Sequence, residues 1–62
     1  MTTVVIFDEE GTKLDSWFLD DGAIPAIGDT IEIGYVARVE ERHWRAEDEE
    51  PVVQLKVRQI GH

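Results

Sequence analysis

The stretch that decides the fold is AIPAIGDTIEI, which occupies residues 23–33. Pro25 restricts its own backbone angle φ and favours a rigid turn, and the Gly28-Asp29 pair that follows is also typical of a turn. Residues 30–33 then alternate between polar and apolar, which is the pattern of a β-strand with one buried face. The stretch therefore predicts a loop that leads into a strand, and it indicates an architecture rather than a chemistry.

The N-terminal third predicts a β-hairpin over residues 2–19. Residues 2–7 (TTVVIF) are almost all β-branched or aromatic, and Gly11 ends the interruption DEEG where a hairpin loop needs a positive φ. Residues 12–19 (TKLDSWFL) alternate, and Asp20-Asp21-Gly22 then ends the strand. One face of the second strand carries Leu14, Ser16 and Phe18, and the other carries Lys13, Asp15, Trp17 and Leu19.

Two further strands are expected in the C-terminal half. In residues 35–44 (YVARVEERHW), Val36 and Val39 stand three apart, which indicates a β-bulge near residues 37–38 or a strongly bent strand. A helix over residues 35–50 is the competing interpretation. Residues 45–51 (RAEDEEP) predict a solvated loop, and residues 52–60 (VVQLKVRQI) alternate cleanly, as a strand with one buried face does. The predicted core consists of Ile6, Leu14, Phe18, Ile31, Val39, Val53, Leu55 and Val57.

Five short strands separated by turns predict one all-β domain spanning residues 1–62. Candidate architectures are an SH3-like partly open small barrel with antiparallel strands, an OB-like barrel and a small sandwich. The spacing Pro25-x-x-Gly28-Asp29-x-Ile31-x-Ile33, followed by Tyr35-Val36-x-x-Val39, resembles the second and third strands of SH3-like small β-barrel domains of short bacterial and phage proteins. The resemblance implies the SH3-like fold and no functional residue.

Size and charge limit the function classes. A domain of 62 residues buries only about 60% of its unfolded surface, so we expect marginal stability. There is no cysteine for a disulfide, which leaves a second subunit as the expected source of extra stability. The formal net charge of −8 opposes binding to phosphate backbones and anionic lipids. Residues 1–37 hold eight acids and one base, whereas residues 38–62 hold six acids and five bases.

No pattern for catalysis, metal binding or a cofactor is present in the sequence. The acidic clusters at residues 8–10, 20–21 and 47–50 are contiguous and lack the alternating spacing of a calcium loop. His43 and His62 have no cysteine with which to form a zinc site. Nucleophilic catalysis needs a serine or cysteine held by a base and an orienting group, and the single serine, Ser16, lies mid-strand between Asp15 and Trp17. We therefore expect a protein that is not an enzyme and that uses neither metal nor cofactor.

Basic and aromatic residues are interleaved in the second half of the chain, as on surfaces that bind single-stranded nucleic acid. The members of this set are Arg38, Arg42, His43, Trp44, Arg45, Lys56 and Arg58. Glu40, Glu41 and the run at residues 47–50 lie among them, so cross-strand ion pairs are the favoured interpretation. A nucleic-acid-binding barrel would need Arg38, Arg42 and Lys56 on one acid-free face.

The first hairpin is apolar on both faces, and one small core cannot bury both of them. The predicted protein interface consists of Val5, Phe7, Trp17 and Leu19 on one face of the hairpin, with Trp44 as a further anchor. Two alternatives remain open: a bent barrel that wraps both faces, and a loop at residues 24–27 that covers one.

The leading functional hypothesis is a non-catalytic small β-barrel that binds a protein partner or assembles with itself. The alternative is an acidic mimic of nucleic acid that inhibits a nucleic-acid-binding enzyme, which would need its carboxylates in a phosphate-like stripe. The sequence also lacks a charged, apolar leader and any apolar run near the roughly 18 residues that span a bilayer. We therefore expect a cytoplasmic protein with no membrane partner.

Overall fold

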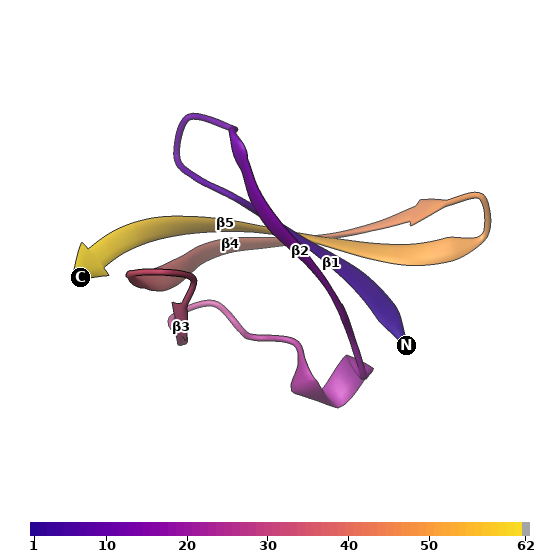
Figure 1. The fold of residues 1–62 in the computed structure, drawn as a ribbon. Helices are drawn as coiled ribbons and strands as arrows, with labels where there is room; N and C mark the ends of the chain where they lie inside the picture. Colours follow the sequence, from indigo (N-terminus) through magenta and orange to yellow (C-terminus); the bar gives the residue numbers. More distant parts are fainter. Residues whose placement is uncertain (62) are drawn as a thin grey trace.

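The computed structural model describes residues 1–61, except the side chain of residue 47, and it is built almost entirely from β-strands (Figure 1). The strands are β1 (Thr2–Phe7), β2 (Lys13–Leu19), β3 (Thr30–Glu32), β4 (Val36–Glu47) and β5 (Glu50–Gly61), and a short 3-10 helix η1 (Asp21–Ala23) follows β2. The competing helix over residues 35–50 is therefore wrong. The solvated loop predicted at residues 45–51 is also wrong, because β4 and β5 continue until a two-residue turn at Asp48 and Glu49.

The five strands form one curled, barrel-like sheet in the order β2-β1-β5-β4-β3. The prediction of an all-β, partly open small barrel is confirmed at this level. One pairing differs from the predicted antiparallel set, because β1 lies parallel to β5, with Val4 opposite Val53 and Ile6 opposite Leu55. The first and last strands thus lie side by side in the middle of the sheet.

The Gly28-Asp29 turn fixes the loop before β3 onto β4. The Asp29 carboxylate accepts a hydrogen bond from the Ala26 amide at 2.9 Å. The Gly28 amide donates to the Val39 carbonyl at 2.8 Å, and the Val39 amide donates to the Asp29 carbonyl at 2.9 Å. Gly28 has a φ of 94°, a backbone conformation that side chains with a Cβ rarely adopt. The Gly28-Asp29 pair, which predicted the turn, therefore also attaches the loop to the sheet.

β4 bends where its register with β5 shifts. Shifts lie between Val36 and Ala37 and between Val39 and Glu41, so the irregularity predicted near residues 37–38 is present just beside that position. The second shift leaves Glu40 as an extra residue, after which Arg42 faces Leu55. Extra residues of this kind increase twist and bend a strand, which curls the sheet.

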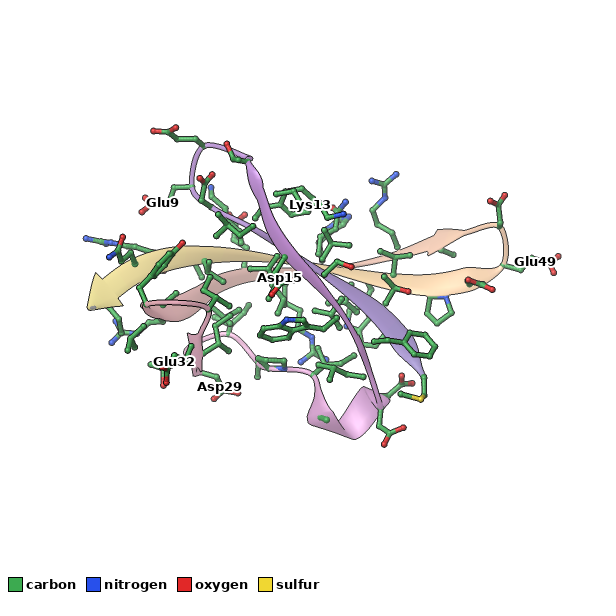
Figure 2. All side chains as sticks on the ribbon, viewed as in Figure 1. Glu9, Lys13, Asp15, Asp29, Glu32 and Glu49 are labelled. Atoms are coloured by element: carbon green, nitrogen blue, oxygen red, sulfur yellow. The ribbon has the colours of Figure 1, made fainter. Side chains whose placement is uncertain are left out.

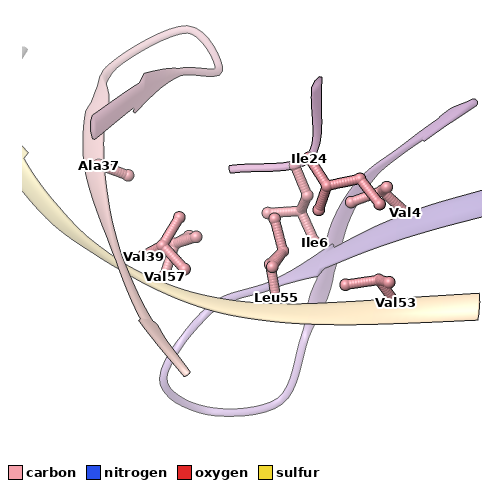
Figure 3. Close-up of a cluster of buried hydrophobic side chains, with 8 residues drawn as sticks. All are labelled: Val4, Ile6, Ile24, Ala37, Val39, Val53, Leu55 and Val57. Carbon is pink, nitrogen blue, oxygen red and sulfur yellow. The ribbon is translucent and has the colours of Figure 1, made fainter. Parts of the chain in front are cut away.

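The core lies on the inner face of the curl (Figure 3). Its buried members are Val4, Ile6, Ile24, Ala37, Val39, Val53, Leu55 and Val57. Five of the eight predicted core residues are among them, and Ile31 packs against the cluster while partly exposed. Ile24 reaches Ile6 and Val4 from the loop after η1. Thr2 Oγ1 donates a hydrogen bond to the Asp21 carboxylate, which ties η1 to β1.

Two predicted core residues are not buried. Leu14 is 36% exposed and Phe18 is 64% exposed. The cause is a register shift in the first hairpin, where Phe7 faces Lys13 but Ile6 faces Asp15, so that Leu14 is an extra residue. A shift of one residue moves every following side chain to the other face of the sheet. Phe18 therefore points away from the core.

Leu55→Ala should lower the free energy of unfolding by about 2 to 5 kcal/mol, because Leu55 is completely buried at the centre of the sheet. That loss is a large part of the roughly 5 kcal/mol expected for so small a domain. Leu14→Ala is the matched control and should change stability by about 0.5 kcal/mol or less. Urea denaturation followed by circular dichroism measures both, and equal losses would contradict the assignment of the core.

Gly28→Ala should destabilise the domain by about 1 to 2 kcal/mol, because alanine must adopt a left-handed φ at this turn. Nothing lies within 4 Å of the added Cβ, so the loss reports backbone strain alone. Gly22→Ala, at a glycine with ordinary φ and open surroundings, should be neutral or stabilising by up to about 1 kcal/mol. Thermal melts of both variants decide this, and a Gly28→Ala protein as stable as the parent would overturn the role of the turn.

Candidate binding surface

The sheet has an outer face opposite the core, formed by the side chains that alternate with the buried ones. The outer face combines Thr3, Val5 and Phe7 of β1, Lys13, Ser16 and Phe18 of β2, Arg38, Glu41, His43 and Arg45 of β4, and Val52, Gln54, Lys56 and Arg58 of β5. Hydrogen-bonded registers place these residues in rows that cross the strands. One row consists of Phe18, Thr3, Val52 and Arg45, and the next consists of Ser16, Val5, Gln54 and His43.

One end of the outer face is apolar. Phe18 is 64% exposed and Met1 is 65% exposed. Together with Thr3, Glu50 and Pro51 they line a shallow hollow of about 150 Å³. The half-buried Val52 lies beside Thr3 in the same row. Phe18 is therefore an exposed aromatic side chain beside a hollow on this face.

Basic side chains gather on the outer face. The strand register places Lys13 opposite Phe7, Arg38 opposite Arg58, and Arg45 opposite Val52. Lys56 lies between the buried Leu55 and Val57 along β5, so its side chain points outward. Five of the six lysines and arginines of the chain therefore belong to this face. Acids lie beside some of them: among the described residues, Lys56 Nζ lies 4.0 Å from the Glu41 carboxylate, and Arg58 Nε lies 4.0 Å from the Glu9 carboxylate.

A wider groove lies at the other end of the outer face, beneath the loop that joins β1 and β2. Its volume is about 440 Å³, and its lining includes Phe7, Glu9, Glu10, His43 and Lys56. Asp8, in the same lining, holds the loop in shape, because its carboxylate accepts hydrogen bonds from the amides of Glu10 and Thr12 at 2.9 Å each. The groove is thus lined by acids of the loop together with an aromatic ring and a lysine from the strands.

The predicted interface residues do not share one face. Val5 and Phe7 lie on the outer face, as expected, but Trp17 faces Val4 and Leu19 faces Thr2, so both point to the inner face and pack against the core. Their grouping in one register was wrong, because the extra residue Leu14 shifts the hairpin by one position. Sequence alternation missed the exposed Phe18, which takes the outer position instead.

The two tryptophans lie on the inner face in different surroundings. Trp17 is half-buried, and its indole Nε1 donates a hydrogen bond to the Asp15 carboxylate at 3.0 Å. Trp44 faces Val53 and remains 45% exposed. The Arg42 guanidinium lies 5.4 Å from the centre of the Trp44 ring, within the range of a cation–π contact. Trp44 is therefore the more accessible of the two predicted anchors.

Arg42 lies on the opposite face of the sheet from Arg38 and Lys56, with which it would have to form a nucleic-acid surface. It faces Leu55 on the inner face, whereas Arg38 and Lys56 lie on the outer face. Glu41 also lies beside Lys56. The single acid-free face that the nucleic-acid hypothesis needs is therefore not formed by these residues.

The acidic clusters lie at separate turns around the sheet (Figure 2). Glu9 and Glu49 mark two of these clusters, which lie far apart from each other. Among the residues that the structure describes, no three His, Cys, Asp or Glu side chains gather as a metal site would require. His62 and the side chain of residue 47, which belong to the predicted sets, lie outside the described residues.

Comparisons with known proteins give no further guide. No family model matches the sequence, and neither the curated proteins nor the solved structures include a match. Within residues 1–61 the structure has no helix that is long and apolar enough to cross a membrane.

Calcium and chelator should leave the melting temperature unchanged. The carboxylates at the turns are dispersed, and a cation site of useful affinity would stabilise the folded chain when filled. Melts in millimolar calcium, in chelator and in buffer alone should superimpose. A rise of several degrees with calcium would instead identify one of the acidic turns as a ligand set.

Proposed function

We propose that the chain is a non-catalytic protein-binding module, and that the apolar end of its outer face binds an acidic peptide segment with a large apolar side chain. The observation that carries this proposal is the position of Phe18, exposed over a hollow on the face that also holds five of the six basic residues. Exposed aromatic side chains surrounded by polar groups are typical anchors of protein interfaces.

The charge of the face favours an acidic partner. Arg45 is in the row of Phe18, and Lys13 lies at the other end of β2, beside the β1–β2 loop, so basic groups extend from the row of the apolar patch to the far end of the face. Opposite charges at the rim of an interface steer partners and fix their orientation.

A protein segment suits this face better than a nucleic acid. The chain as a whole carries a net charge of −8, and Glu41 and Glu9 reduce the positive field at Lys56 and Arg58. Nucleic-acid affinity comes largely from many uncompensated phosphate contacts, which such a surface does not provide. An acidic peptide needs fewer contacts of this kind, because its apolar side chain contributes binding energy in the hollow beside Phe18.

Selection of a library of short random peptides against the immobilised chain should enrich sequences that combine Asp or Glu with a large apolar residue. Phe18→Ser should weaken their binding about thirtyfold, since a central aromatic anchor contributes about 2 kcal/mol or more. Ile27→Ser is the matched control: Ile27 is also 64% exposed but lies in the loop before β3. Fluorescence polarisation measures both, and equal binding by Phe18→Ser and the parent would contradict the proposal.

A further inference from the structure

β4 has one edge that is only partly paired. β5 covers the other edge along its whole length, whereas β3 pairs only with Val36 to Arg38. The Gly28-Asp29 turn extends this cover to Val39 through two backbone hydrogen bonds. From residue 40 to residue 46, no described strand pairs with this edge, and Figure 1 shows that part of the hairpin extending away from β3. We call residues 40–46 the open edge.

An unpaired edge presents a row of backbone donors and acceptors, and an added strand would satisfy them. We propose that the open edge binds the open edge of a second copy of the chain in antiparallel register, with His43 opposite His43 of the second copy. Two sheets then join into one continuous sheet with a two-fold axis through this position. An arrangement of this kind closes on itself and gives a dimer rather than a fibre.

The charges of the open edge are complementary in this register. Glu41 faces Arg45 of the second copy, and Arg42 faces Trp44 of the second copy, and symmetry repeats both pairs. Glu41 and Arg45 lie on the outer face and Arg42 and Trp44 on the inner face, so every pair shares a face as opposed residues must. Arg42 already lies 5.4 Å from its own Trp44 ring, and the second indole would add another cation–π contact.

Neighbouring registers lose this complementarity. If the axis passes through residue 42, Arg42 faces Arg42 of the second copy. If the axis passes through residue 44, Arg45 faces His43 of the second copy, and Glu41 faces no base of the second copy. Like charges directly opposite each other destabilise a sheet, and opposite charges stabilise it. The sequence of the edge thus selects the axis at His43.

The ends of the open edge favour the same centre. The Gly28-Asp29 turn blocks the edge at Val39, and the tight turn at Asp48 and Glu49, with φ of 49° and 68°, ends the strand on the other side. His43 lies midway along residues 40–46. The inference goes beyond the proposed function, because it names a second copy of the chain as a partner at the open edge rather than at the Phe18 patch.

Single cysteines test the register directly, because the chain contains no cysteine of its own. In His43→Cys the two introduced thiols face each other, with Cα atoms about 4.5 to 5.5 Å apart, a distance that a disulfide can bridge. In Glu41→Cys they lie four residues apart along the strand, about 13 Å, which a disulfide cannot bridge. Mild oxidation should therefore give a disulfide-linked dimer rapidly with His43→Cys and slowly with Glu41→Cys. Equal rates would overturn the register.

Charge reversal tests the pairing by complementation. Arg45→Glu places two acids opposite each other, and Glu41→Arg places two bases opposite each other, so each variant alone should dimerise roughly tenfold more weakly than the parent. An equimolar mixture of the two restores opposite charges at both positions and should recover the dimer. Sedimentation equilibrium measures the mass against 7.1 kDa for one chain, and circular dichroism verifies that each variant is folded.

Two results would reject the dimer. One is a parent chain that stays monomeric at millimolar concentration, and the other is a mixture that associates no better than its components. In either case the charged side chains of the open edge would serve to prevent the edge from pairing with another chain. The peptide-binding proposal is tested independently of the dimer. Phe18→Ser should still dimerise but should no longer bind the selected peptides. A parent chain that dimerises but enriches no peptides would reject peptide binding at the Phe18 patch and leave the dimer supported.

Discussion

The parallel pairing of β1 with β5 is the constraint on which the rest of the structure depends. It places the first and last strands in the middle of the sheet and brings Val4 and Ile6 beside Val53 and Leu55, all fully buried. β2 and β4 can then only add outside this pair, one through the first hairpin and the other through the second. Because parallel strands cannot be joined by a tight turn, the whole chain between them, including the Gly28-Asp29 loop, forms the connection.

An open sheet built in this way leaves surfaces that a closed barrel would not have. The inner face is filled by the core and covered in part by Ile24 from the loop. The outer face remains in contact with solvent and collects most of the basic side chains, while the acidic clusters lie at the turns. The proposed peptide surface lies on this outer face, and the open edge of β4 exists because β3 pairs only with Val36 to Arg38.

Several features could be predicted from the sequence because their signals are local. The strict alternation of residues 52–60 identified Val53, Leu55 and Val57 as core, and Gly28-Asp29 identified the turn before β3. The parallel β1–β5 pairing carried no local signal, since it joins segments at opposite ends of the chain. Ile24 and Ala37 were also missed, because their burial depends on the loop and the bend of β4 rather than on alternation.

The candidate site depended on one residue that the alternation of β2 could not place. If the pairing of β1 with β2 had no register shift, Ile6 would face Leu14, and Phe18 would point to the core, as predicted. Because the register shift leaves Leu14 as an extra residue, Trp17 points inward and Phe18 points outward. Both arrangements bury one large aromatic residue, so hydrophobicity does not discriminate between them. Only the geometry of the hairpin decides which side chain is available to a partner.

Native-state hydrogen exchange of the backbone amides in dilute solution tests the open sheet most directly. If the sheet is open as described, the amides of β5 at Val53, Leu55 and Val57 exchange slowest, since β5 has a hydrogen-bonded strand on each side. The outward amides of residues 40–46 should exchange quickly under the same conditions. Protection of residues 40–46 equal to that of β5 in a monomeric sample would contradict the account, because another part of the chain would then have to cover that edge.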